Sequence, residues 1–100
     1  MTPTQVYETL PTLTESTFLT AAQAKNLNCR CLTRGRSYTA PIGFTVKDDL
    51  RNGAEGIDEW VTLDGGDAYV LTNYQWITVG VTQYGNITQL YIKFDIYLCK

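Results

Sequence analysis

A turn signal between two long runs rich in β-branched residues constrains this fold more than any other feature of the sequence. Gly85 and Asn86 separate the runs 74–84 and 87–98, in which side chains alternate in character along the chain. A pair of this kind suits the tight two-residue turn whose twist matches that of its flanking strands. The sequence therefore predicts an antiparallel hairpin with this pair as its loop, in which Ile77 faces Phe94 and Val79 faces Ile92.

The predicted register separates two faces of this hairpin. One face is a continuous apolar stripe, and the other carries Tyr74, Trp76, Tyr91, Lys93, Asp95 and Tyr97. Flat aromatic surfaces rimmed by hydrogen-bonding groups suit protein interfaces and also sugar rings. We therefore expect this aromatic face to be a protein interface, a carbohydrate site, or a second side of the sheet that the N-terminal segment covers.

Period-two alternation extends over the chain from residue 29 onward and predicts an all-β fold. The candidate strands are 29–34, 37–39, 42–46, 57–63, 68–71, 74–84 and 87–98. Glycine-bearing segments separate them, including the turn from Asp64 to Asp67. Six to seven short strands joined in this way predict a small antiparallel β-sandwich or a partly open barrel.

The first 28 residues differ in character from the rest. Prolines and threonines interrupt every period in residues 1–19, yet scattered apolar residues make this segment too hydrophobic for a solvated tail. We expect an extended arm that docks on a protein surface. Thr20 and Gln23 fit a capping box, which predicts a short helix at about 20–27. The predicted organisation is therefore an arm and helix in 1–28 followed by a β domain in 29–100.

The absence of histidine limits the chemistry of this chain. Among its 100 residues there is no histidine, which excludes a Ser-His-Asp triad, a Cys-His dyad and a histidine-ligated metal. Cys29, Cys31 and Cys99 offer no fourth thiolate for zinc, so we expect no metal and no cofactor. Cys99 either stays reduced or pairs with Cys29, with Cys31 or with another copy of the chain. We predict a protein that is not an enzyme.

Charged residues are few and separated along the chain. Eight basic residues face ten acidic ones, for a formal net charge of −2, which argues against nucleic acid as a partner. Half of the basic residues form a predicted basic loop of Lys25, Arg30, Arg34 and Arg36. A predicted solvated acidic rim contains Asp48, Asp49, Glu55, Asp58 and Glu59. Unlike charges on different faces favour head-to-tail contacts between copies.

Composition and layout together predict a structural subunit. Only 18% of the residues are charged while threonine and tyrosine are abundant, a blend typical of virion and secreted β-proteins. No run is long and apolar enough to span a membrane, and the N-terminus does not resemble a cleaved signal. We expect a virion protein, such as a phage capsid, connector or fibre-associated subunit, that binds itself or a scaffold. The alternatives are a cytoplasmic location and a small β module that binds a glycan or peptide.

Overall fold

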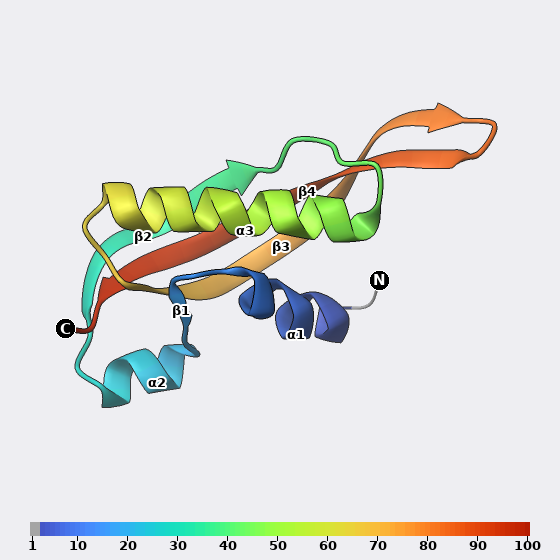
Figure 1. The fold of residues 1–100 in the computed structure, drawn as a ribbon. Coiled ribbons are helices and arrows are strands. Elements are labelled where there is room, and N and C mark those ends of the chain that lie inside the picture. The colour runs from blue at the N-terminus through green and yellow to red at the C-terminus, as the bar shows by residue number, and fades with distance from the viewer. Residues whose placement is uncertain (1–2) are drawn as a thin grey trace.

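The computed structural model describes residues 3–100, which form one mixed four-stranded sheet with three helices packed around it (Figure 1). In chain order the elements are α1 (Pro3–Leu13), β1 (Thr17–Phe18), α2 (Ala21–Asn26), β2 (Arg30–Thr39), α3 (Val46–Leu63), β3 (Ala68–Thr82) and β4 (Gly85–Leu98). The strand order is β1-β3-β4-β2. β1 lies parallel to β3, and the other neighbours are antiparallel.

The expected all-β sandwich or barrel is wrong because residues 46–63 form the long helix α3. Leu50, Ala54, Ile57 and Val61 are buried on one side of it, at the spacing of a helix that packs on a core. The Thr45 hydroxyl caps the helix by accepting from the backbone N–H of Asp48. The segment also contains two buried glycines, which as a sequence pattern are typical of a loop.

Those glycines allow α3 to approach the sheet closely. A Cβ placed on Gly56 would overlap the ring of Tyr38 on β2. A Cβ on Gly53 would lie 3.2 Å from the side chain of Leu90 on β4. The glycines therefore mark close packing of helix on sheet rather than a break between strands.

The N-terminal segment is not the extended arm that the sequence predicts. Pro3 occupies the first position of α1, where its missing N–H costs nothing, and Val6 and Leu10 are buried one helical turn apart. The predicted short helix and its capping box are confirmed. The Thr20 hydroxyl accepts from the N–H of Gln23, and the Gln23 side chain accepts from the N–H of Thr20.

The last hairpin exists, but its predicted register is wrong. Thr82 pairs with Gly85, so Gln83 and Tyr84 form the turn. The register of β3 against β4 also shifts twice, between Leu71 and Asn73 and between Thr78 and Gly80. The Thr82 hydroxyl accepts from the N–H of Tyr84, a local side-chain bond that stabilises the turn before the predicted position. The shift at Thr72, whose hydroxyl donates to the carbonyl of Lys93, reverses the alternation of β3 beyond it.

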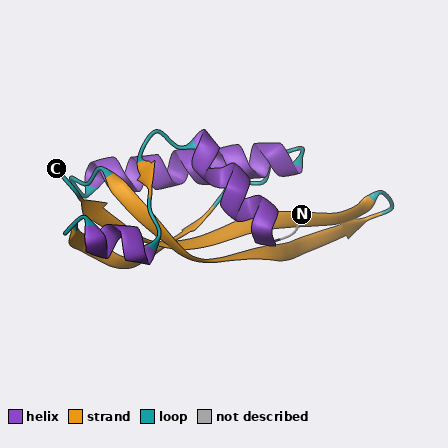
Figure 2. Ribbon diagram, turned by 90° about the horizontal axis from the view of Figure 1, so that it is seen from below, coloured by secondary structure: helices purple, strands orange, loops and turns teal. Residues whose placement is uncertain are grey.

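Helices cover both faces of the sheet, but unequally, and Figure 2 shows the long helix α3 along one side of it. The main core lies between the sheet and the pair α1 and α3, with Tyr69, Phe94 and Ile96 among its fully buried side chains. A smaller cluster lies on the opposite face, where α2 packs over Ala68 and Val70. A disulfide between Cys29 and Cys99 closes this end of the molecule, and Cys31 is a free thiol.

Candidate interaction surface

The far end of the β3–β4 hairpin projects from the body of the protein (Figures 1 and 2). β2 pairs with β4 only as far as Tyr91, followed by a bond from the N–H of Ala40 to the carbonyl of Leu90. β1 pairs with β3 only at Ala68 and Tyr69. Residues 77–89, here called the hairpin arm, therefore consist of two strands with no strand beside either of them. The arm extends along the 50 Å axis of a molecule that measures 25 × 19 Å across.

The hairpin arm exposes apolar side chains that a folded domain normally buries. No residue of the arm is buried. Val81 is 76% exposed and Tyr84 at the turn is 91% exposed. The large exposed apolar side chains of the arm are Ile77, Val79, Val81, Tyr84 and Ile87. An isolated two-stranded ribbon of this kind is marginal in water, so its apolar surface is suited to contact with another protein.

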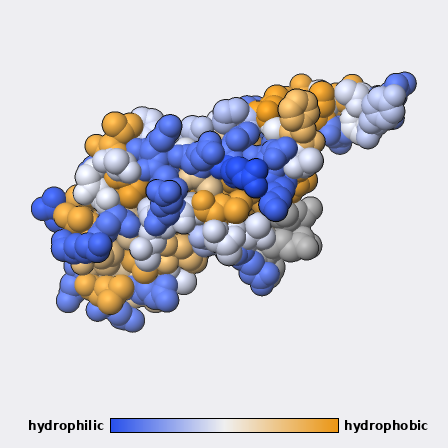
Figure 3. Space-filling model, in the orientation of Figure 1, coloured by the Kyte–Doolittle hydropathy of each residue, from blue (hydrophilic) through white to orange (hydrophobic). Residues whose placement is uncertain are grey.

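A neighbouring loop enlarges this apolar surface. Phe44 is fully exposed, and Ile42 and Val46 beside it are about half exposed. The segment 42–46, here called the loop 42–46 and ending at the first residue of α3, lines a shallow hollow of about 230 Å³ together with Asp49 and the arm residues 86–88. Figure 3 shows hydrophobic surface gathered where the arm leaves the body. Of the eleven large apolar side chains that are exposed in the described part of the chain, eight belong to the arm and this loop.

The sequence contains a signal for this surface that strand alternation and turn motifs do not reveal. Between Asp67 and Lys93 there is no charged residue, and none lies between Arg36 and Lys47. Exposed edge strands are usually protected by charges, especially lysine, that prevent association with other chains. β3 retains two bulges, but the arm has no such charge. The first uncharged stretch covers the whole arm, and the second covers the loop beside it.

The structure divides the predicted aromatic face between the two sides of the sheet. Because Thr72 reverses the alternation of β3, Tyr74 and Trp76 point toward α1 and the main core. The Tyr74 ring lies 5.5 Å from that of Tyr7 on α1, edge to face. Tyr91, Lys93, Asp95 and Tyr97 alternate with buried residues of β4 and therefore lie on the opposite face. The six residues do not form one platform.

Two residues of the opposite face, Asp95 and Tyr97, are engaged within the protein, whereas Lys93 is exposed. Asp95 accepts a hydrogen bond of 2.8 Å from the N–H of Gly35 and lies 3.9 Å from Arg34. Tyr97 packs beneath α2 in the smaller cluster, and burial is the main reason that the pKa of its hydroxyl is raised. Asp95 therefore fastens β2 to β4, and Tyr97 supports α2 on this face of the sheet.

The predicted basic loop is not brought together as one site. Lys25 lies on α2, Arg30 begins β2, and Arg34 faces Asp95. The guanidinium of Arg36 stacks 4.0 Å from the ring centroid of Trp60 and pairs with Asp64 at 3.3 Å. Arg36 therefore fastens β2 to α3 on the helix-covered face, rather than joining Arg34 to bind a ligand.

The predicted acidic residues all lie on α3, but they do not form a solvated rim. Asp49 is buried and accepts a hydrogen bond of 2.7 Å from the N–H of Gly43. Asp48 lies 3.9 Å from Arg51 one helical turn away. Glu55 and Glu59 are exposed near Tyr38, whose pKa is raised first by burial and then by their negative charges.

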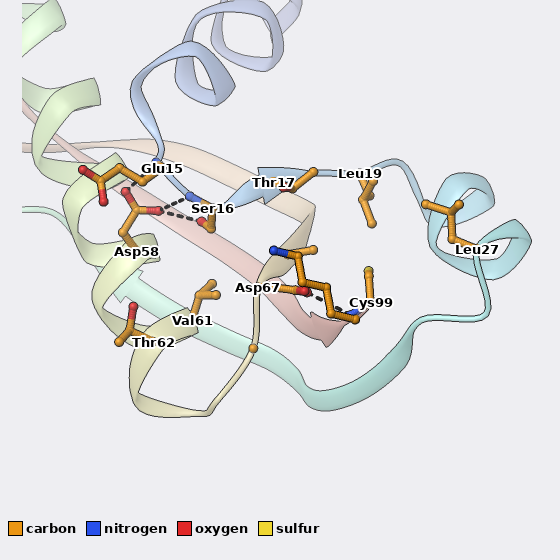
Figure 4. Close-up of a pocket in the computed structure, with 13 residues that line it drawn as sticks. Glu15, Ser16, Thr17, Leu19, Leu27, Asp58, Val61, Thr62, Asp67 and Cys99 are labelled. Carbon is orange, nitrogen blue, oxygen red and sulfur yellow. Dashed lines mark hydrogen bonds between the residues drawn. The ribbon is translucent and has the colours of Figure 1, made fainter.

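Asp58, the fifth of these acids, lines a hollow of about 400 Å³ near the opposite end of the sheet from the arm (Figure 4). Its carboxylate accepts hydrogen bonds from the backbone N–H groups of Glu15 and Ser16 and from the Ser16 hydroxyl. Asp67 in the same hollow accepts from the N–H of Cys99. Both carboxylates therefore fasten chain segments to the body, and neither is paired with the other for acid-base chemistry.

The same end of the body buries a tyrosine. Tyr69 is fully buried beneath Phe18 and shares a hydrogen bond of 3.0 Å with the Thr14 hydroxyl. Burial raises the pKa of Tyr69 to about 12, and the nearby charge of Asp58 adds to the rise while the bond to Thr14 opposes it. The contact holds the segment after α1 against β3.

No known protein family, curated protein or solved structure matches this chain. Within residues 3–100 there is no helix long and apolar enough to cross a membrane. The same residues contain no group of three or more acidic, cysteine or histidine side chains placed to hold a metal ion. The exposed apolar side chains of the hairpin arm and the loop 42–46 are the feature of the described chain that most resembles an interaction surface.

Proposed function

We propose that this chain is a non-enzymatic structural subunit that assembles with other protein subunits through its hairpin arm. The observation that carries this proposal is the combination of an uncharged projecting ribbon with five large exposed apolar side chains. Burial of apolar surface is the main driving force of association, and interface centres are depleted of charged residues. The arm has both properties, whereas the charged residues all belong to the rest of the chain.

The kind of assembly that we propose is a virion, in which the chain packs against copies of itself or against a scaffold. This part of the proposal rests on the low charge and the threonine- and tyrosine-rich composition. The alternative of a glycan- or peptide-binding module depends on a single aromatic platform. Because Tyr74 and Trp76 lie on the other side of the sheet from Tyr91, that alternative has lost its main support.

Sedimentation equilibrium over a range of protein concentrations tests the proposal. The wild-type mass should rise above the 11.2 kDa of one chain as concentration increases. Val81→Lys places a charge in the middle of the arm and should weaken association by roughly tenfold or more, because the charge must be desolvated in the contact.

Leu63→Lys provides the matched control for this experiment. Leu63 at the end of α3 is 73% exposed, nearly the same as Val81, but it lies outside the arm. The control should associate like the wild type. A wild-type mass that stays at one chain throughout, or equal weakening by both substitutions, would contradict self-association through the arm.

A further inference from the structure

The surface that fits the hairpin arm best is the hairpin arm of a second copy. We infer that two chains associate arm to arm about a two-fold axis, with the loop 42–46 of each copy at the margin of the contact. This inference rests on the proposed function. The inference concerns which surface receives the arm. It differs from a head-to-tail arrangement, in which the arm would bind the body of the next copy.

Charge is the first argument for a second arm as the partner surface. The body carries all of the charged residues, including the exposed Glu55 and Glu59 on α3 and the exposed Arg34 on β2. An uncharged apolar arm that covered these groups would remove them from water without offering a partner for their charge. Another arm and its adjoining loop contain no charged residue, and the carboxylate of Asp49 beside them is already buried and accepts from the N–H of Gly43. A second arm with its adjoining loop is therefore the part of the described chain that offers the arm the most neutral apolar surface.

The open strands of the arm provide the second argument. The N–H of Ala40 bonds to the carbonyl of Leu90, so Leu90 directs its backbone groups toward β2 and away from β3. Trp76 lies opposite Leu90 and, by the alternation of an antiparallel ladder, directs its own backbone groups to the free edge of β3. Thr78, two residues further along the same edge, does the same. The free edges of two β3 strands can form backbone hydrogen bonds with each other when the two strands run antiparallel.

Symmetry provides the third argument. A two-fold contact is self-complementary. If a residue i of one copy touches a residue j of the other, then residue j of the first copy touches residue i of the second. One uncharged surface is then sufficient for both partners, and the contact closes at two copies. Eight of the eleven large apolar side chains exposed in the described residues belong to the arm and the loop 42–46, so one part of each chain supplies most of the apolar surface for such a contact.

Site-specific crosslinking combined with sedimentation tests this arrangement. In a Cys31→Ser background, which removes the free thiol, Val81→Cys places a single reactive group in the middle of the arm. A short bismaleimide should join two such chains into a covalent dimer in high yield. Leu63→Cys, equally exposed at the end of α3, should give at least roughly tenfold less dimer at the same concentration.

The outcomes separate this inference from the proposed function. If the wild-type protein does not self-associate, the arm-to-arm contact is wrong, and only binding of the arm to a scaffold remains of the proposed function. If it associates but its mass continues beyond two copies, or if Leu63→Cys crosslinks as well as Val81→Cys does, the arm-to-arm contact is wrong and assembly through the arm remains. Ile87→Cys on the other strand of the arm provides a second probe, and failure of both arm probes in an associating protein would also overturn the inference.

Discussion

The body and the hairpin arm share the same two strands, β3 and β4, but they differ in what covers those strands. In the body, α1 and α3 bury one face and α2 covers part of the other. In the arm, no residue is buried and no charge protects the exposed apolar side chains. The comparison teaches that one continuous hairpin serves two purposes. Its inner half supports the fold of a single chain, and its outer half is available to a partner.

The largest expected effect compares a core side chain with an exposed one. Phe94→Ala removes a fully buried ring from the inner half of β4 and should lower the free energy of unfolding by about 3–5 kcal/mol. Val81→Ala in the arm should change it by less than about 0.5 kcal/mol. Urea denaturation at low protein concentration measures both. Similar losses from the two substitutions would show that the arm is part of the core of the single chain.

The disulfide should stabilise the body without affecting the arm. Cys29 and Cys99 are 70 residues apart in sequence, and closing a loop of that length is worth about 4 kcal/mol in the chain-entropy account. Replacement of both cysteines by serine should therefore lower the free energy of unfolding by that order. Association of the folded protein should be unchanged, with Cys31→Ser as the control. Stability equal to that of the control would refute this account of the disulfide.

Alkaline pH should destabilise the body through Tyr69. Its pKa is about 12 in the folded protein and 10.0 for an ordinary tyrosine, so the folded state holds the proton more tightly. The resulting stability is present below pH 10 and is lost as the pH rises from 10 through 12, by about 3 kcal/mol in all.

Tyr69→Phe isolates this effect from the titration of other groups. Denaturation curves measured from about pH 9 to pH 12 should fall less steeply for this variant than for the wild type. Parallel curves for the two proteins would mean that Tyr69 does not cause the loss.

Two glycines provide the smallest expected contrast. Gly56→Ala places a methyl group against the ring of Tyr38 and should destabilise the body by about 1–3 kcal/mol, despite the better helix propensity of alanine. Gly80→Ala in the arm places its methyl group 3.6 Å from Ile87, an ordinary contact, and should have an effect below about 0.5 kcal/mol. Thermal unfolding of both variants tests this, and equal shifts in Tm would contradict the close packing of α3.

Local signals in the sequence predicted local structure well. Thr20 and Gln23 form their capping box because both partners lie within one turn of each other. The last hairpin exists because its two runs favour strands. Its register was wrong because the turn lies two residues earlier, at Gln83 and Tyr84, and because the shifts between Leu71 and Asn73 and between Thr78 and Gly80 each add a residue to β3.

Features that depend on tertiary packing were harder to predict. The glycines of α3 look like loop residues until the neighbouring ring of Tyr38 is known. Leu50, Ala54, Ile57 and Val61 have the spacing of a buried helix face, and this signal was available in the sequence. The candidate surface was also readable as an uncharged stretch. The projection of this surface from the body could not be predicted, because it depends on where β2 ends beside β4.

Amide hydrogen exchange at two protein concentrations tests the central claim most directly. The account predicts that amides of the hairpin arm, residues 77–89, exchange rapidly in dilute protein and become protected as concentration rises. Amides of the inner half of β4 at Ile92 and Phe94 should be protected equally at both concentrations, because the body folds without a partner. Arm amides that show the same protection at both concentrations, while another surface gains protection, would contradict the account.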